Sequence, residues 1–572
     1  MLTTDILIII KKTIQDAAQA LFFPENPQDL PRVELILNTD KDSSHGDVST
    51  TIALQISKIL KKNPRDVATA LKDELVKVGT STPELASLFG SVTLAGPGFL
   101  NFSLSGADWT WLLSNIISAP RDFFRPKELT SKRVLIEFVS ANPTGPLHLA
   151  HGRNAIIGDV LASVFSFVGH QVTREFYIND AGNQINKLGA SLRNRYLEQL
   201  GIKEAFPEGG YAGEYLIKTA QTLFEQEGNA HENAPAEFFA QYAKTAMLAL
   251  IKSNLADYGV TFDHFTSEKS MYESGKVAAA VAALSEKGFT YQADGALWLR
   301  STDFGDDKDR VLRKADGDMT YLAPDTAYYF DNFSQGYDKL INILGQDHHG
   351  YVTPRNAALK ALGCDISKFT CLIYQLVLMK KNDAYVRMSK RAGNFEQLSD
   401  VIKIVGRDVA RYFFLNRKAD AHLELDLEQA LKQNDENPVY YIHYAFVRTH
   451  SLLQKAADAD SQLAAFVKEL ESQPATTLAD MTHIPSTAHN LIKKIATLRS
   501  LLEAIEFNNQ THMLAYYAYE LAAAFHNFYS HTKIIIPDDI ATTKNNLLIV
   551  SAVNRTLDLC LELLGLSKPK SM

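Results

Sequence analysis

The fold that the sequence predicts depends on one stretch, Arg133-Val-Leu-Ile-Glu-Phe-Val-Ser-Ala-Asn-Pro-Thr-Gly-Pro-Leu-His-Leu-Ala-His-Gly152. Residues 133–139 form an apolar run typical of a buried strand. A loop rich in proline and glycine follows, and residues 154–168 have the apolar spacing of a helix. A strand predicted at 171–178 and a helix at 183–200 continue the alternation. This alternation predicts an α/β fold with a doubly wound, parallel, Rossmann-like sheet.

The parts of the chain on either side of this stretch differ from it in composition and in the spacing of apolar residues. Residues 339–344 and 369–379 predict two later strands, and 206–234, rich in Gly, Glu and Asn, indicates an insertion. Residues 120–132 predict a linker, and 457–485 predict a variable loop. We therefore expect an N-terminal α+β domain at 1–115, the α/β domain at 130–400 with an insertion near 200–300, connecting helices at 401–435, and an all-α helical bundle at 436–572.

Length and composition fit several domains and exclude some classes of protein. The chain has 572 residues, of which 46% are hydrophobic, enough for several cores. Its formal net charge of −8 excludes a protein held to nucleic acid by bulk charge, but not local basic surfaces. The three cysteines, Cys364, Cys371 and Cys560, are too few and too scattered for a disulfide framework. Because no apolar run approaches the length of about 18 residues that a membrane span needs, and the N-terminus lacks a secretory pattern, we expect a cytoplasmic protein without a membrane segment.

The loop between the first strand and its helix predicts a phosphate site. A helix that begins after a parallel strand offers free N–H groups and a favourable dipole at its N-terminus. Pro143, Gly145 and Pro146 fix a tight path for the loop and let the backbone approach a ligand. His148 and His151 lie three residues apart near the helix start, so both can donate to phosphate oxygens. The alternatives are a zinc pair, for which a third ligand is missing nearby, and two ordinary surface histidines.

Two further segments are candidates for the rest of a nucleotide site. The loop Val386-Arg-Met-Ser-Lys-Arg-Ala-Gly-Asn394 would place a mobile cation over a triphosphate, unless it is only a solvated basic turn. The segment Gly345-Gln-Asp-His-His-Gly350 follows a predicted strand. Gly345 would allow a ribose to approach closely, and Asp347 would accept a hydrogen bond from its hydroxyl. Ligation of a metal ion by the Asp-His-His string is the alternative.

These strings together resemble the signatures of class I aminoacyl-tRNA synthetases. The Ser-Ala-Asn-Pro-Thr-Gly-Pro context at 140–146 is most similar to the arginyl-tRNA synthetase family, and the resemblance extends over nearly the whole chain. Ala150, Arg387 and Arg391 depart from the family pattern, which has Gly, Lys and Ser there. Membership implies a monomer that activates L-arginine with ATP and Mg²⁺, transfers it to tRNA(Arg), and has no structural metal.

The resemblance also implies roles for individual residues. His148, His151 and Lys390 are the expected catalytic residues, which stabilise charge on the phosphates. The residues expected to bind ATP are Pro143, Gly145, His148, His151, Gly152, Gly345, Asp347, Met388, Ser389 and Lys390.

A third set of residues is expected to bind arginine. A guanidinium group needs planar carboxylate partners. Glu137 lies within an apolar strand, where an acid is costly unless it is paired; the alternative is an exposed face of the strand. The family implies that the arginine-binding residues are Glu137, Asn142, Tyr321, Asp325 and His349.

Both flanking domains are expected to contact tRNA. The strings at 45–51 and 96–101 resemble the additional N-terminal domain of the family. There Lys61, Lys62 and Arg65 form a basic cluster suited to phosphates, although a solvated helix end gives the same pattern. The C-terminal bundle resembles the anticodon-binding domain, in which bases stack on aromatic and arginine side chains. The candidates are Tyr440, Tyr444 and Arg448, but tyrosines at helical spacing are more often core residues.

Three other functions stay open at this point. One is a synthetase for another amino acid or a related nucleotidyltransferase. A second is a metal-dependent hydrolase, and a third is a non-catalytic RNA-binding protein, which would leave the nucleotide signatures unexplained. The hydrolase would use His148, His151, Asp347, His348 and His349.

Overall fold

A computed structural model describes residues 6–38, 46–82, 85–89, 92–127, 129–381, 384–385, 397–472 and 486–572. At its centre lies a sheet with the strand order β12-β11-β5-β6-β7, in which every pairing is parallel. This confirms the predicted doubly wound sheet. The chain order reverses between β5 and β11, and such sheets bind ligands outside the carboxyl ends of the strands at this point. The five strands are β5 (Arg133–Glu137), β6 (Gln171–Ile178), β7 (His264–Ser267), β11 (Lys339–Gly345) and β12 (Phe369–Tyr374).

Helix α7 (Leu149–Val168) connects β5 to β6 and positions the first half of the site. It is buried along most of its length, with apolar side chains such as Ile156 and Phe165 fully enclosed. The helix begins at Leu149 rather than at the predicted residue 154. His148 therefore occupies the N-cap position, and His151 lies in the first turn.

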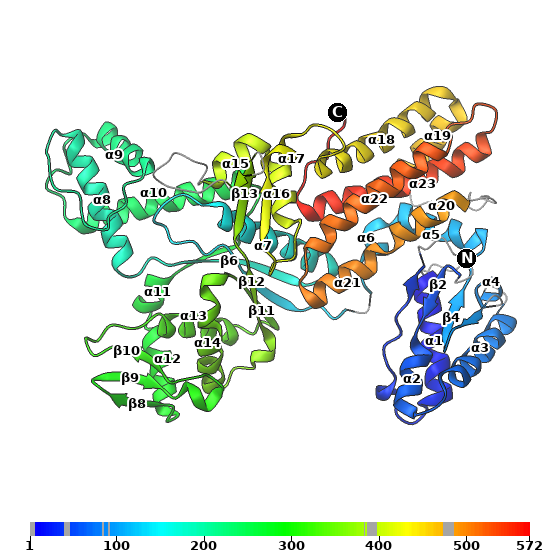
Figure 1. Cartoon of the computed structure of the whole chain (residues 1–572), viewed down its shortest axis with the longest axis horizontal. Helices are drawn as coiled ribbons and strands as arrows, with labels where there is room; N and C mark the ends of the chain where they lie inside the picture. The colour runs from blue at the N-terminus through cyan, green and yellow to red at the C-terminus, as the bar shows by residue number, and fades with distance from the viewer. Residues whose placement is uncertain are drawn as a thin grey trace.

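Two inserted units separate later strands of the parallel sheet. Between β6 and β7, three helices pack around a core of their own, and the segment 206–234, expected to be an insertion, contains one of them. Between β7 and β11 lies a second unit with the antiparallel sheet β10-β9-β8. Figure 1 shows the first unit at the upper left and the second at the lower left. The first unit comprises α8 (Asn183–Gln199), α9 (Glu214–Glu227) and α10 (Ala236–Asp257). The second includes α11 (Glu268–Glu273), α12 (Lys276–Glu286), β8 (Thr290–Ala293), β9 (Ala296–Leu299), β10 (Arg310–Arg313) and α13 (Leu322–Ser334). Helix α14 (His349–Leu362) then connects β11 to β12.

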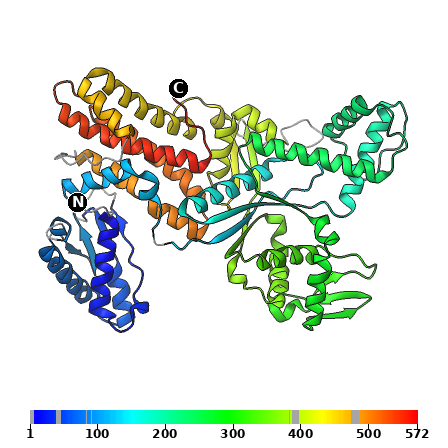
Figure 2. The ribbon, with the colours of Figure 1, turned by 180° about the vertical axis from the view of Figure 1, so that it is seen from behind.

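The N-terminal domain is α+β, as predicted. Its sheet has the order β1-β2-β4-β3, and both ribbon views place the domain beside the C-terminal helices (Figures 1 and 2). Asp47 forms a 2.7 Å ion pair with Lys493, and the ring of Trp109 stacks on His489 at 5.0 Å. Its elements are α1 (Ile6–Phe22), β1 (Ile36–Leu37), β2 (Val48–Thr50), α2 (Ile52–Leu60), α3 (Pro64–Ser81), α4 (Ala86–Phe89), β3 (Thr93–Ala95), β4 (Phe99–Phe102) and α5 (Gly106–Ser118).

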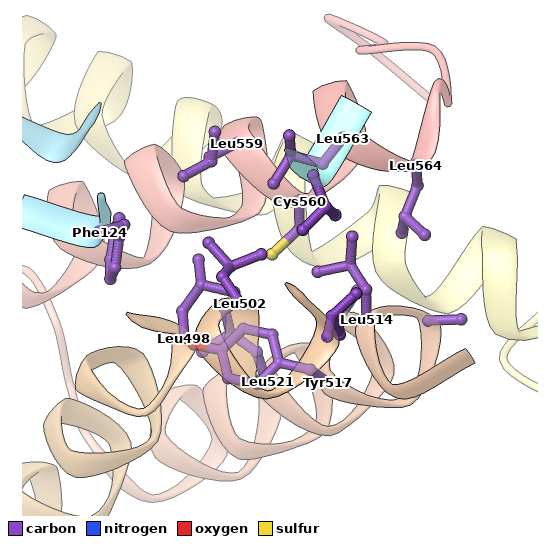
Figure 3. Close-up of a cluster of buried hydrophobic side chains, with 14 of the residues drawn as sticks. Phe124, Leu498, Leu502, Leu514, Tyr517, Leu521, Leu559, Cys560, Leu563 and Leu564 are labelled. Atoms are coloured by element: carbon purple, nitrogen blue, oxygen red, sulfur yellow. The ribbon is translucent and has the colours of Figure 1, made fainter. Parts of the chain in front are cut away.

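The C-terminal domain is the predicted helical bundle. Leucines from several helices meet in its centre around Tyr517 and Cys560 (Figure 3). Within the described residues, no helix has the length and the apolar character that crossing a membrane would require. The helices are α18 (Pro438–Ala459), α19 (Ser461–Ser472), α20 (Ser486–Ala496), α21 (Leu498–Asn508), α22 (His512–His531) and α23 (Ile540–Leu564).

Two segments expected to be a linker and a loop contain helices instead. The supposed linker at 120–132 contains a helix, α6 (Pro120–Phe124), because proline is tolerated in the first turn and two phenylalanines are buried. Figure 3 shows Phe124 at the edge of the bundle core, where burial of its ring contributes about 2 kcal/mol. The supposed loop at 457–485 contains α19, and 473–485 lies outside the described residues.

The predicted strand at 369–379 is two strands that belong to different sheets. Beyond β12, the strand β13 (Val377–Lys381) pairs in parallel with β15 (Leu423–Asp426) and antiparallel with β14 (Ala384–Tyr385). The region 401–435 is consequently not helical throughout. Besides β15 it contains α15 (Leu398–Val405), which begins just before it, α16 (Arg407–Leu415) and α17 (Leu427–Leu431).

Candidate active site

A cavity of about 1830 Å³ opens at the carboxyl ends of β5 and β11, where the strand order reverses. The loop after β5, the start of α7, the loop after β11 and the start of α13 contribute to its walls. The second nucleotide loop, with the expected residues Met388, Ser389 and Lys390, lies outside the described residues. Predicted residues that line the cavity are Glu137, Asn142, Gly145, His148, His151, Tyr321, Asp325, Gly345 and Asp347.

The backbone of the loop after β5 is held in an unusual conformation. Val139 and Ser140 have φ angles of 67° and 41°, a left-handed region that is strained for a β-branched residue. Asn154 on α7 accepts from the N–H of Val139 at 2.8 Å and donates to the carbonyl of Ile343 at 3.0 Å. This buried amide therefore connects the loop after β5 to β11, at the place where the strand order reverses. Sequence reasoning missed it, because no local pattern distinguishes it.

The two histidines lie against each other at the start of α7. Their ring centres are 3.6 Å apart, and the rings are nearly parallel at 26°. Nδ1 of His151 accepts from the backbone N–H of His148 at 3.3 Å. Burial, followed by the proximity of His148, lowers the pKa of His151 to about 3. His151 is therefore neutral at pH 7 with its proton on Nε2, which makes this nitrogen a hydrogen-bond donor.

The helical insertion supports the same loop from the other side. The hydroxyl of Tyr215 donates to the carbonyl of Thr144 at 2.8 Å. A side chain at Gly145 would meet this hydroxyl at 3.0 Å, so glycine allows the contact. Nδ2 of Asn142 donates to Oε1 of Gln184 on α8 at 3.1 Å. The inserted unit thus forms one wall of the cavity, a contribution that its sequence does not reveal.

Some of the glycine and proline residues expected to bind ATP line the cavity, and others are packed away from it. Gly345 lies against Asp347, whose Oδ1 would be 2.5 Å from a side-chain carbon at 345. Pro143 and Gly152, in contrast, are buried and do not line the cavity. A side chain at Gly152 would meet Leu398 at 2.5 Å, so its role is to let the start of α15 pack on α7.

Glu137 is a buried carboxylate at the floor of the cavity. It accepts hydrogen bonds from the hydroxyl of Tyr329, from Nδ2 of Asn342 at 2.8 Å and from Oγ of Ser140 at 2.9 Å. Burial raises the pKa of Glu137 to about 7, although the bonds from Tyr329 and Ser140 lower it. The exposed-face alternative for Glu137 is wrong, because the residue is 4% exposed.

Two more carboxylates lie near Glu137. Asp325, at the start of α13, faces the same cavity, and burial raises its pKa although Arg355 lowers it. Glu268 follows β7; burial, then Asp180 and Asp325, raise its pKa to about 7. Burial has the larger effect and raises the pKa of Tyr177, and all three carboxylates lie near its hydroxyl and raise this pKa further. Sequence reasoning missed Glu268, because β7 is too short and too polar to be recognised as a strand of the parallel sheet.

The remaining expected residues lie at the edge of the cavity or away from it. Tyr321 lines the cavity and is 63% exposed. His349 is exposed and does not line it, whereas His348 and Tyr351 do. In the described part of the chain, no three His, Cys, Asp or Glu side chains are placed to hold a metal ion, so the hydrolase alternative lacks a ligand cluster there.

The residues expected to contact RNA are on two separate domains. Lys61, Lys62 and Arg65 are exposed where α2 ends and α3 begins. In the bundle, the guanidinium of Arg448 lies 4.6 Å from the ring centre of Tyr444, which is 44% exposed. The ring of His526 stacks on the same tyrosine. Tyr440 is half-buried.

Comparisons with known proteins give one family for all three domains. Residues 113–434 match the family described as "tRNA synthetases class I (R), catalytic domain". Residues 442–572 match the "DALR anticodon binding domain", and 8–104 match the "Arginyl tRNA synthetase N terminal domain". The chain is 40% identical over 569 residues to the arginine–tRNA ligase of Bacillus subtilis, which covers 99% of this chain and 98% of that protein.

Solved structures agree with these matches. A structure described as a putative arginyl-tRNA synthetase from Campylobacter jejuni has a TM-score of 0.73 and 34% identity, covering 82% of this chain and 100% of its own. The arginyl-tRNA synthetase of Thermus thermophilus has a TM-score of 0.71 and 20% identity, covering 99% and 100%. The second likeness supports the fold.

Proposed function

The chain belongs to the arginyl-tRNA synthetase family, and from this premise we propose how its residues carry out the reaction. Its activity is that of an arginine–tRNA ligase, which activates arginine with ATP and transfers it to tRNA. The observation that carries the assignment of residues is the position of the carboxylate pocket. Glu137, Glu268 and Asp325 line the same cavity as the histidines of the nucleotide loop.

In the first step, an oxygen of the arginine carboxylate attacks the α-phosphorus of ATP. The bond from this phosphorus to the pyrophosphate oxygen breaks, which gives arginyl-adenylate and pyrophosphate. The enzyme acts by positioning the reactants and by stabilising charge. We assign Nε2–H of His151, together with His148 and Lys390, to the phosphate oxygens, and Asp347 beside Gly345 to the ribose. Mg²⁺ accompanies ATP as part of the substrate.

The carboxylate pocket binds the cationic groups of arginine. A guanidinium can pair with two carboxylate oxygens at once, and Glu137 at the end of β5 and Asp325 at the start of α13 both supply carboxylates to the pocket. Asn142 and Tyr321 are assigned to the polar groups of the amino acid. Neutral amino acids would leave the buried Glu137 and the half-buried Asp325 unpaired, so the pocket rejects them without a separate editing site.

In the second step, the 2′-hydroxyl of the terminal adenosine of tRNA(Arg) attacks the activated carbonyl and releases AMP. The basic cluster of Lys61, Lys62 and Arg65 is assigned to the tRNA backbone, and Tyr440, Tyr444 and Arg448 to anticodon bases. We further propose that the enzyme acts as a monomer in the cytoplasm, where its three free cysteines stay reduced.

The proposed function is tested by ATP–pyrophosphate exchange with each amino acid, with and without tRNA. We expect exchange that depends on arginine and on tRNA(Arg). Exchange supported by a different amino acid would contradict the assignment of the pocket. Loss of activity with a zinc-selective chelator would instead favour the metal-dependent alternative.

Arginine binding should weaken as the pH falls below about 7. In the free pocket the pKa of Glu137 and that of Glu268 are each about 7, and a bound cation lowers both because it stabilises the ionised forms. Protons thus compete with arginine at low pH, and the KM for arginine should rise by up to about tenfold per pH unit for each carboxylate that must ionise. The measurement is the exchange rate at varied arginine between about pH 6 and about pH 8.5. A KM that stays constant over this range, relative to the KM for ATP, would contradict the prediction.

A further inference from the structure

Arg355 is a buried cation inside the pocket that we assign to a cationic substrate. It lines the cavity from α14 and is 2% exposed. Its guanidinium lies 4.7 Å from the ring centre of Tyr329 and 4.8 Å from that of Phe369. Nη1 donates to Oδ1 of Asn342 at 3.2 Å, and Nη2 donates to Sγ of Cys371 at 2.6 Å. Two rings and two hydrogen bonds therefore fix this guanidinium in place.

Two of the pocket carboxylates are connected to Arg355. Oδ2 of Asp325 lies 3.6 Å from Nη1, near enough for an ion pair but beyond a hydrogen bond. Asn342, which accepts from Arg355, donates to Oε2 of Glu137 at 2.8 Å. Because the rings hold the guanidinium, it cannot turn to saturate Asp325. The positive charge of Arg355 stabilises the ionised form of Asp325, and this carboxylate can still accept hydrogen bonds from a ligand.

Charge in the pocket depends on the groups around Arg355. Among the neighbours of Asp325, Arg355 lowers the pKa of this carboxyl most, ahead of His348, against the effect of burial. Although burial lowers the pKa of Arg355, Tyr329 and Asp325 raise it, so the guanidinium stays charged. The titratable groups that face Arg355 are Asp325 and Tyr329 on α13, Cys371 on β12 and Glu137 on β5, and His348 and Glu268 lie near Asp325.

The formal charges suggest what this internal cation does. When Glu137, Glu268 and Asp325 are all ionised, these three carboxylates together with Arg355 leave two negative charges in this part of the cavity. Arginine carries two cationic groups besides the carboxylate that must reach ATP. We propose that Arg355 is a specificity-determining positioning residue, a fixed counter-cation that balances one carboxylate and holds Asp325 and Glu137 ready for the substrate. This inference rests on the arginine-binding roles proposed above.

Replacement of Arg355 with methionine separates this proposal from simple attraction. Coulomb's law alone predicts that loss of a positive charge tightens the binding of a cation. The proposal predicts the opposite, because the unbalanced buried carboxylates take up a proton instead. In ATP–pyrophosphate exchange with tRNA, Arg355→Met should raise the KM for arginine about tenfold near pH 7. The pH at which the KM for arginine begins to rise, which we call the midpoint of the pH profile, should move upward by about one unit. The KM for ATP should change by less than about threefold.

Two further variants make the experiment specific. Arg355→Lys keeps the charge but loses the planar fork, so it should raise the KM for arginine while the midpoint stays at the wild-type pH. Lys403→Met removes a cation that lines the same cavity from α15, and the midpoint should again stay in place. Stabilisation by arginine against thermal unfolding gives a second measure of binding that does not need catalysis.

The outcomes decide between a charge-balancing and a merely structural role. If Arg355→Met lowers the KM for arginine or leaves it unchanged, the proposal is wrong. It is also wrong if both KM values rise alike and the midpoint does not move. If Arg355→Met does not fold, Arg355→Lys decides, since an upward shift of its midpoint by about one unit would show that the positive charge is not what sets the profile. Absence of arginine-dependent exchange in the wild-type enzyme would contradict the arginine-binding roles themselves.

Discussion

Replacing Glu137 with glutamine should lower kcat/KM for arginine by about 100-fold or more. The substrate loses a buried charged partner, which costs about 3 kcal/mol, and each 1.4 kcal/mol corresponds to a factor of about ten. The change also disturbs the site, because Tyr329, Asn342 and Ser140 all donate to this carboxylate. The amide nitrogen of glutamine is itself a donor and cannot accept from them. The measurement is tRNA-dependent exchange at varied arginine, and the KM for ATP should change little.

The matched control for this variant is Glu175→Gln. Glu175 lies opposite Glu137 on the neighbouring strand β6 and is equally buried, at 4% exposed, but it does not line the cavity. Burial raises its pKa as well. Because Glu175 does not line the cavity, the control should leave kcat/KM for arginine within about threefold. Equal losses in the two variants would mean that Glu137 supports the sheet rather than the substrate.

Sequence patterns predicted the fold correctly where the signal is local. The prediction failed where tertiary contacts decide which strands pair. The apolar runs of β5 and β11, and the alternation of strand and helix patterns along the chain, predict a parallel sheet before any contact is known. The run at 369–379 is also mostly apolar, but it breaks into β12 and β13 because its second half pairs with β15. No property of the run itself indicates the distant partner.

The site follows the same division. Glu137 and His151 could be named because an acid in an apolar strand and a histidine at a helix start are unusual positions. Glu268 and Arg355 have no such signal in the sequence, since each gains its place from the packing of segments far apart in the chain. The exposed His349 differs from His348 by one residue, and only the start of α14 decides which side chain faces the cavity.

Helix α7 joins the nucleotide loop to the rest of the molecule. Asp159, midway along it, forms ion pairs with Arg174 on β6 and Arg411 on α16. Arg411 also donates to the carbonyl of Leu564, at the end of the last helix of the bundle, at 2.9 Å. The helix that carries His151 is thus fixed to both the sheet and the C-terminal domain, which holds the donor that we propose for the phosphate in a constant position relative to the cavity.

Two replacements of His151 should separate its hydrogen bond to the loop from its proposed contact with phosphate. The amide of asparagine can occupy the place of Nδ1, which accepts from the N–H of His148, but it leaves no donor at the place of Nε2. Glutamine reaches the place of Nε2 and supplies a donor there, while it gives up the bond to His148. If stabilisation of the phosphate is the main role, His151→Asn should lower kcat of arginine-dependent exchange by about 100- to 1000-fold, as expected for loss of one preorganised donor.

His151→Gln should retain far more activity than His151→Asn, within about tenfold of the wild type, because its donor is present but less firmly oriented. Since the pKa of His151 is lowered to about 3, the wild-type histidine does not titrate near neutrality, and the ratio of wild-type to His151→Gln activity should be independent of pH between about 6 and about 8. The reverse order of activities would show that the bond to His148 is what the reaction needs. A ratio of wild-type to variant activity that rises as the pH is lowered would show that the charged imidazolium, rather than the neutral ring, acts on the phosphate.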